Sequence, residues 1–169
     1  TSGYMPLGAV VVSQPIALHF EDHTLWSGLT ASGHPISCAA ALATLRVYRE
    51  DKLLENTRRL EPVVAQGLDD LKSRHPSVGD IRGLGLFWII ELVKDRDTRE
   101  PLVPWNAKPS ELGPMPAVSR HLRQQGLYTF VKWNWIFVAP PLCINADQIA
   151  EGLSVIDSAL QIADDSLAD

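Results

Sequence analysis

From residue 51 onward, helix-like and strand-like stretches alternate along the chain, and this order constrains the fold more than any other feature. Apolar residues recur at helical spacing over residues 53–73, which predicts a long amphipathic helix. Residues 79–92 are mainly apolar and include Gly83 and Gly85, a pattern typical of a strand pair or of one long strand bent at its glycines.

The second half of this region repeats the same order. Residues 116–125 have a helical pattern, and the hydrophobic stretch 127–140 predicts a tight hairpin that turns at Asn134. Residues 146–163 form a final amphipathic pattern, with Asn145 as its expected cap. The order α-β-β-α-β-β-α predicts an α+β arrangement in which helices cover an antiparallel sheet.

The first 50 residues have a different pattern. The valine-rich run at residues 9–12 is typical of a strand that is buried on both faces in a parallel sheet. Helices are expected at residues 15–22 and 35–49, the second with Ser32 or Gly33 as its cap. The chain is therefore predicted to be α/β, and the change of pattern predicts two parts, residues 1–50 and residues 51–169.

Composition narrows the possible partners. The hydrophobic content of 46% predicts a packed core, and the formal net charge of -5 argues against nucleic acid and anionic membranes as partners. The longest apolar runs, 8–12 and 84–90, are far too short to span a membrane. Cys38 and Cys143 are the two cysteines, and their apolar surroundings predict reduced, buried thiols and a cytoplasmic location.

A glycine-rich segment at residues 28–35 contains the first candidate for chemistry. The hydroxyl of Thr30 stands in a turn ahead of a predicted helix, where backbone amides and the positive helix end favour a phosphate group. The spacing suits Thr30 and Ser32 equally as plain helix caps, and taken alone it favours the caps. His19 and His23 share a helix face but lack a third ligand, so no metal site is predicted.

Several segments together resemble the class III aminotransferases, enzymes of fold type I that use pyridoxal 5'-phosphate. The segments that carry the resemblance are Thr1–Val10, Gly28–Pro35, Arg82–Leu86 and Ala139–Leu142. The resemblance implies that residues 1–50 are the end of the large cofactor-binding domain and that residues 51–169 are the small C-terminal α+β domain. It also implies a homodimer or higher homo-oligomer, in which Thr30 binds the phosphate of the cofactor held by the other subunit.

The resemblance also says where the cofactor-binding lysine is expected. In this family it stands just before a segment like Thr1–Val10, so it is expected upstream of Thr1. Lys52, Lys72, Lys94, Lys108 and Lys132 all lack the buried position at a strand end that lowers the pKa of an amine for this chemistry. No catalytic residue is therefore assigned within the chain, and the chain by itself is expected to be inactive.

One position departs from the family pattern. Many of these enzymes clamp the substrate carboxylate with an arginine in the strand before the Ala139–Leu142 segment, and counting back places Phe130 there. Phe130 cannot bind a carboxylate. Lys132 lies two residues on, on the same strand face, and either supplies the positive charge or is a solvated edge lysine. Trp133 and Trp135 suit both a core and the wall of a substrate pocket.

The expected activity is the transfer of an amino group from an amine or an ω-amino acid to a keto acid such as pyruvate. Other pyridoxal-phosphate enzymes of this architecture act as decarboxylases, aminomutases or racemases, and these alternatives remain open. A further alternative is a non-catalytic α/β binding module. Such a module predicts closed hydrophobic faces, whereas part of a larger domain predicts exposed apolar surface.

Overall fold

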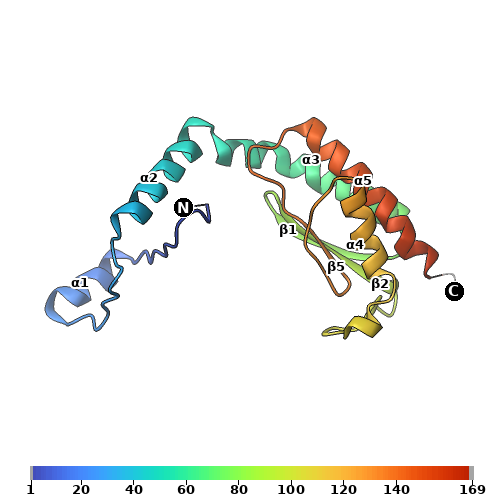
Figure 1. The fold of residues 1–169 in the computed structure, drawn as a ribbon, viewed down its shortest axis with the longest axis horizontal. Coiled ribbons are helices and arrows are strands. Elements are labelled where there is room, and N and C mark those ends of the chain that lie inside the picture. The colour runs from blue at the N-terminus through green and yellow to red at the C-terminus, as the bar shows by residue number, and fades with distance from the viewer. Residues whose placement is uncertain (1, 168–169) are drawn as a thin grey trace. The chain divides into compact units, whose positions relative to one another are not determined.

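The structure, a computed structural model, describes residues 2–167 and divides into two compact units (Figure 1). The N-terminal unit ends at Lys52, and the C-terminal unit begins at Leu53. The described part of the chain has five α-helices and five strands, and the strands all belong to the C-terminal unit.

The described part of the N-terminal unit contains two helices. Helix α1 spans Gln14–Asp22 and helix α2 spans Pro35–Glu50, close to the predicted ranges. Pro35 takes the first helical position, where its missing amide hydrogen has no role. The cap of α2 is His34 and not Ser32 or Gly33, because Pro35 fixes the start of the helix and the residue before a proline is extended.

The predicted strand at residues 9–12 does not form. These residues have no ladder partner in the described chain, and the side chains of Val10 and Val11 are 90% and 95% exposed. A strand that is buried on both faces needs neighbouring strands for its backbone groups and covering layers for its side chains. The other described residues of the N-terminal unit likewise form no core, and Ser37 is the one buried residue among them.

The C-terminal unit follows the predicted order of elements. Helix α3 (Leu53–Arg74) leads to the hairpin of β1 (Val78–Leu84) and β2 (Phe87–Asp95). The short strand β3 (Glu100–Pro101) and a 3-10 turn (Pro109–Glu111) come next. Helix α4 (Met115–Gln124), the hairpin of β4 (Val131–Lys132) and β5 (Trp135–Val138), and helix α5 (Ala146–Asp165) complete the unit. The α/β fold class, with helices on an antiparallel sheet, is confirmed.

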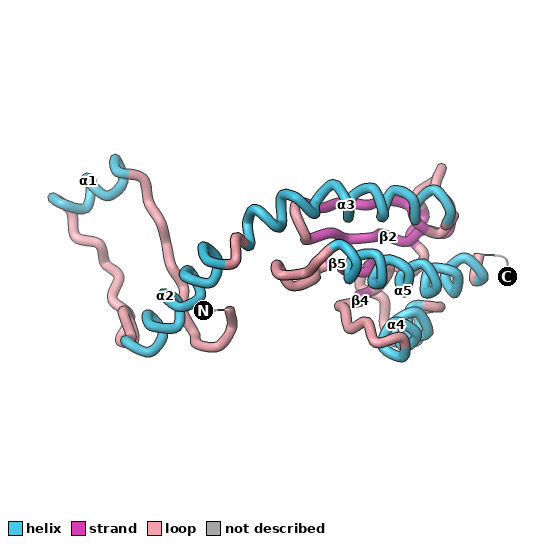
Figure 2. The backbone as a smooth tube through the Cα atoms, turned by 90° about the horizontal axis from the view of Figure 1, so that it is seen from above, coloured by secondary structure: helices cyan, strands magenta, loops and turns pink. Residues whose placement is uncertain are grey.

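The sheet has the order β1-β2-β5-β4, and every neighbouring pair is antiparallel. Strand β3 pairs with the end of β2, beside Val93. Helices α3, α4 and α5 lie on the same side of this sheet (Figures 1 and 2). Their apolar residues and those of the facing strands form one core, whose most deeply buried members include Leu60, Leu68, Ile90, Ile136, Val118 and Leu160.

The segment resembling the family's Arg-Gly-x-Gly-Leu motif is the β1–β2 hairpin. Gly85 has φ +61°, a left-handed conformation that glycine adopts without strain, and it is the first residue of the two-residue turn. A Cβ atom at Gly83 would lie 2.2 Å from the ring of Trp88. The indole of Trp88 therefore lies directly against Gly83, and its N–H donates to the Gly85 carbonyl at 2.9 Å. These glycines have a structural role.

Candidate active site

The candidate site is on the side of the sheet that the helices leave uncovered, which we call the open face. Side chains alternate between the two sides of each strand. Ile90 and Ile136 point into the core, so their neighbours along the strands point to the open face. The open face carries Leu84, Phe87, Phe130, Lys132, Trp135 and Phe137.

Phe130 and Lys132 lie together on this face. The amide of Phe137 donates to the Phe130 carbonyl at 3.0 Å, and Lys132 stands opposite Trp135 in the hairpin. The ring of Phe137 lies 5.1 Å from that of Phe130 and 6.0 Å from that of Phe87. We call these three phenylalanines the aromatic row. Phe87 and Phe130 remain more than half exposed, so the row is an apolar surface open to a ligand.

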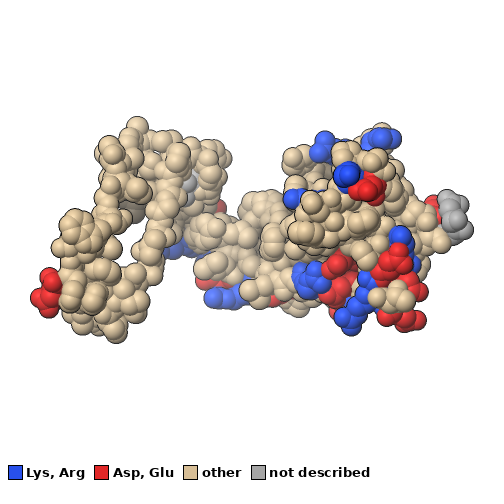
Figure 3. Space-filling model, turned by 90° about the horizontal axis from the view of Figure 1, so that it is seen from below, with Lys and Arg blue, Asp and Glu red and all other residues tan. Residues whose placement is uncertain are grey.

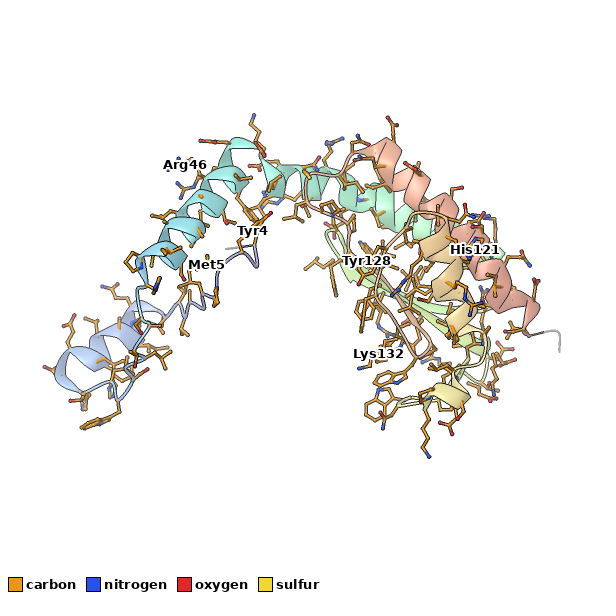
Figure 4. All side chains as sticks on the ribbon, viewed as in Figure 1. Tyr4, Met5, Arg46, His121, Tyr128 and Lys132 are labelled. Atoms are coloured by element: carbon orange, nitrogen blue, oxygen red, sulfur yellow. The ribbon has the colours of Figure 1, made fainter. Side chains whose placement is uncertain are left out.

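Lys132 is exposed (Figure 4), and three tryptophans cluster beside it. Its ammonium lies 4.3 Å from the ring centroid of Trp133, within the range of a cation–π contact. The Trp133 ring lies 5.3 Å from that of Trp135 and 5.4 Å from that of Trp105. In the described chain, Lys132 has no carboxylate partner, so its positive charge is available to an anion.

The turn that carries this cluster is anchored to the sheet. Asn134 is 3% exposed, and its side-chain amide donates to the Leu92 carbonyl at 2.8 Å. The Leu92 amide donates in turn to the Asn134 carbonyl, also at 2.8 Å. The hairpin turn predicted at Asn134 is present, with Trp133 and Asn134 as its two loop residues. A rigid turn of this kind fixes where Lys132 and Trp135 stand.

The other charged groups of the open face are already paired. Arg82 donates to Asp80 at 2.7 Å and to Glu91 at 2.6 Å. The hydrogen bond to Glu91 is the main reason why the pKa of Arg82 is raised. Burial by itself would raise the pKa of Asp80, but hydrogen bonds from Arg82 and the Ile81 amide lower it. Arg82 is therefore already paired with two carboxylates.

Thr30 belongs to the other unit. It is exposed in the turn at residues 30–33 that leads into α2, and its hydroxyl has no partner in the described chain. The first turn of α2 has no side-chain cap, so its amides also stay available. The hydroxyl and these amides are the kinds of donor that bind a phosphate group.

The lysines, histidines and cysteines considered in the sequence do not form a catalytic site among the described residues. Each of the five lysines is at least partly exposed. The rings of His19 and His23 stack with centroids 4.1 Å apart, and the described residues contain no cluster of side chains able to hold a metal ion. Both cysteines are free. Cys143 is exposed, so its predicted burial is wrong, and Cys38 is half-buried and not fully buried as predicted. No helix in the described part of the chain combines the length and the apolar character needed to cross a membrane.

Sequence reasoning missed two parts of this site. Trp105 lies in the charged and proline-rich stretch between β2 and α4, which has no periodicity, so nothing linked it to Trp133. The contact of Lys132 with Trp133 was missed because it depends on the turn geometry. A tryptophan at a hairpin turn, where asparagine or glycine is usual, was the available signal.

Comparison with known proteins identifies the class. A model of the family described as "Aminotransferase class-III" matches residues 1–160. The chain therefore belongs to the class-III aminotransferases.

Individual relatives agree with this family. The chain is 37% identical to taurine:2-oxoglutarate aminotransferase from Bifidobacterium kashiwanohense, solved with pyridoxal phosphate and glutamate, with a TM-score of 0.89 over 98% of this chain and 36% of that one. It is 32% identical to a probable gamma-aminobutyrate transaminase 3 of Oryza sativa subsp. indica, over 100% of this chain and 33% of the relative. It is 36% identical to an ethanolamine-phosphate phospho-lyase homolog of Caenorhabditis elegans, over 79% of this chain and 27% of the relative. The chain spans about a third of the length of the curated relatives it matches.

Proposed function

We propose that this protein is a pyridoxal-phosphate-dependent aminotransferase that moves an amino group from a short ω-amino acid or amine to a 2-keto acid such as pyruvate or 2-oxoglutarate. Membership of the class-III family supports the reaction class. The observation that carries the substrate assignment is the unpaired ammonium of Lys132, which lies on the same open face as Phe130 and the aromatic row.

Residues 1–50 are proposed to be the end of a large cofactor-binding domain, and residues 51–169 the small domain. The exposed valines at residues 10 and 11 support the first assignment, because a domain with a closed core would bury such apolar side chains. The same exposure argues against a free-standing binding module. The proposal includes a homodimer or higher homo-oligomer located in the cytoplasm, although several relatives are named as mitochondrial or chloroplastic.

The turn before α2 fits the phosphate of the cofactor. The Thr30 hydroxyl stands in the turn that leads into α2, the first-turn amides of α2 have no side-chain cap, and the positive end of the helix adds to the attraction for an anion. In the proposed oligomer Thr30 binds the phosphate of the cofactor held by the other subunit. When bound, pyridoxal phosphate withdraws electrons from the carbon that bears the amino group, so that a proton can leave it.

The open face suits a substrate that is anionic at one end. In this proposal Phe130 occupies the position where many of these enzymes have an arginine, so no guanidinium group binds the substrate there. Lys132, two residues away, supplies a single positive charge instead. Taurine and gamma-aminobutyrate, the substrates in the names of two relatives, each have an amine at one end and an oxyanion at the other. In this proposal Lys132 binds the oxyanion, and the aromatic row excludes water from the carbon chain.

A second candidate function has support from one relative. The similarity to an ethanolamine-phosphate phospho-lyase homolog suggests elimination from a phosphorylated amine, whose phosphate is also an oxyanion. Decarboxylation, amino-group migration and racemisation remain alternatives without a specific observation in their favour. Product analysis distinguishes all of these: transamination consumes a keto acid and forms its amino acid, whereas the phospho-lyase reaction releases phosphate.

The substrate assignment is tested in the full-length protein with Lys132→Ala. The KM for taurine, gamma-aminobutyrate and keto acids is expected to rise by up to about tenfold, because an exposed lysine is a weak clamp. Phe130→Arg is expected to improve keto-acid use and to impair large hydrophobic donors. Lys94→Ala is the matched control, since Lys94 is an exposed strand lysine paired only with Glu100. Unchanged constants in Lys132→Ala would place the oxyanion site elsewhere.

Cofactor binding is tested separately with Thr30→Ala. Loss of one hydrogen bond to a charged phosphate is expected to weaken cofactor retention by about 1.5–3 kcal/mol. Dialysis followed by measurement of bound cofactor gives the affinity, and Ser27→Ala, a nearby hydroxyl outside the turn, is the control. A Thr30→Ala protein that retains cofactor as tightly as the wild type would make Thr30 a plain turn residue.

A further inference from the structure

We infer that Trp133 is a positioning residue that holds the Lys132 ammonium in place for the anionic end of the substrate, and that the β4–β5 turn adopts an unfavourable backbone conformation to do so. The substrate named here rests on the proposed function. The contact itself, and the binding of an oxyanion beside it, do not require turnover and are tested without it.

The backbone of Trp133 is the first observation. Its φ is +51°, in the left-handed region where bulky side chains are uncommon. The turn is a two-residue hairpin loop, in which glycine, asparagine or aspartate normally takes such a position. A tryptophan here makes the turn less favourable, and residues held in rare conformations concentrate at functional sites.

The surroundings explain how the conformation persists. Asn134, the next residue, is tied to Leu92 by two hydrogen bonds, one from its side chain and one to its backbone carbonyl. The Trp133 ring packs against the rings of Trp105 and Trp135. The turn is thus fixed from both the backbone and the side chain, which leaves the ring in one position.

The third observation is the partner of the ring. Lysine has a flexible four-carbon stem, so an exposed lysine normally samples many positions. The Trp133 ring, 4.3 Å from the Lys132 ammonium, attracts the charge and restricts this freedom. Lys132 stays exposed, so an oxyanion can still approach it. The ring therefore orders the ammonium without neutralising it.

The residue facing Lys132 across the hairpin, Trp135, has a buried donor that is unpaired among the described residues. Its indole N–H is buried and has no acceptor in the described chain, although buried donors are almost always paired. Trp135 stands directly opposite Lys132 in the hairpin. The indole N–H is not accessible to a ligand in this conformation, so the exposed Lys132 ammonium is the group that suits a compact oxyanion, a carboxylate or a sulfonate, attached to an amine.

The main experiment compares Trp133→Gly and Trp133→Ala in the full-length protein. Both remove the ring, so both are expected to raise the KM for taurine and gamma-aminobutyrate roughly two- to tenfold, no more than Lys132→Ala does. Glycine adopts a positive φ without strain and alanine adopts it only at a cost, so Trp133→Gly is expected to have the higher unfolding midpoint of the two. In the double variant Trp133→Gly/Lys132→Ala the two effects on KM should not add.

An NMR titration keeps the inference independent of catalysis. The ε-methylene protons of Lys132 are expected upfield in the wild type, because they lie near the Trp133 ring, and at ordinary positions in Trp133→Gly; Lys94 is the control. Taurine and gamma-aminobutyrate, titrated separately, should shift the Lys132 signals and so distinguish a sulfonate from a carboxylate preference. Binding without turnover would overturn the proposed function alone.

Three results would overturn the inference. The first is a normal position of the Lys132 signals in the wild type, and the second is the absence of any shift with either oxyanion. The third is an additive effect of the two substitutions on KM, which would mean that Trp133 acts separately from Lys132.

Discussion

The two units of this chain differ in whether their apolar surface is closed. In the C-terminal unit, Leu60 and Leu68 are fully buried between helices and sheet. In the N-terminal unit, Val10, Val11 and Trp26 are 90%, 95% and 94% exposed. Few charged side chains cover the N-terminal unit on the face seen at the left of Figure 3. A large apolar surface with few charges is typical of a surface that another part of a protein covers.

The difference reflects where the neighbouring strands of each unit come from in the sequence. The strands of the C-terminal unit are antiparallel, so hairpins bring neighbours together within short stretches of chain. A strand of a parallel sheet needs crossover connections, and its neighbours come from more distant segments. Residues 9–12 have the composition of such a strand. We therefore expect residues 53–167 to fold without help and residues 2–52 to require further protein.

Matched truncations should separate the two units most strongly. Leu68→Ala, in the core of α3, is expected to lower the free energy of unfolding by about 2–5 kcal/mol, because it leaves a cavity. Val11→Ala removes exposed methyl groups and is expected to change the free energy of unfolding by less than about 0.5 kcal/mol. Urea denaturation of the chain, followed by circular dichroism, measures both. Similar losses in the two variants would mean that residue 11 is buried in solution.

Added volume provides a second contrast. Gly83→Ala would place a methyl group against the Trp88 ring and is expected to cost about 1–3 kcal/mol. Gly28→Ala meets no atom within 4 Å and is the control from the N-terminal unit, with little or no loss expected. Thermal unfolding measures the difference. A Gly83→Ala protein as stable as the wild type would show that Trp88 moves away at little cost.

The cap of α5 gives a smaller effect. The Asn145 side chain accepts a hydrogen bond from the Gln148 amide at 2.9 Å, and the Gln148 side chain accepts one from the Asn145 amide. Asn145→Ala is expected to destabilise the C-terminal unit by about 1 kcal/mol. Asn145→Asp keeps the acceptor and should retain most of the stability. Equal losses in both variants would exclude capping as the cause.

The smallest effect concerns pH. Both ring nitrogens of His75 face carboxylates, Asp164 at 2.6 Å and Asp157 at 2.8 Å, while Arg74 also bonds Asp157. Every ion pair found among the described residues lies in the C-terminal unit. The hydrogen bond from His75 is the main reason why the pKa of Asp157 is lowered from 3.8. Its stabilising contribution is therefore complete above pH 3.8 and is lost as the pH falls through the lowered pKa.

Denaturation of the wild type and of Asp157→Asn across this range tests the linkage. The asparagine variant should be less stable near neutrality and should approach the wild type at low pH. Asp165→Asn is the control, because its hydrogen bond to Gln161 lies on the exposed surface of α5. A difference between wild type and Asp157→Asn that does not change with pH would show that the charge of Asp157 has no role.

The sequence predicted most of the C-terminal unit because local signals agree there. The helical spacing of α3, the cap at Asn145 and the turn at Asn134 are each encoded within a few residues. The strand at residues 9–12 was wrong for this chain because the apolar pattern predicts burial but cannot supply neighbours. The cap of α2 was misplaced by one or two residues, because Pro35 shifts it to His34.

For the site, the sequence predicted which residues share a strand but not which residues touch. The spacing of Phe130 and Lys132 was sufficient to predict a common face. The contacts of Trp105 with Trp133 and of His75 with Asp157 join segments far apart in the chain. Such contacts depend on the packed fold, and no periodic pattern encodes them.

Hydrogen–deuterium exchange of the chain tests the central comparison most directly. Amides of β2 and α5 should be strongly protected, and amides of residues 9–12 should exchange nearly as fast as in an unfolded chain, because they lack partners. The same residues should become protected in a longer protein that supplies the neighbouring strands. Protection of residues 9–12 equal to that of β2, in the chain by itself as a monomer, would contradict the account.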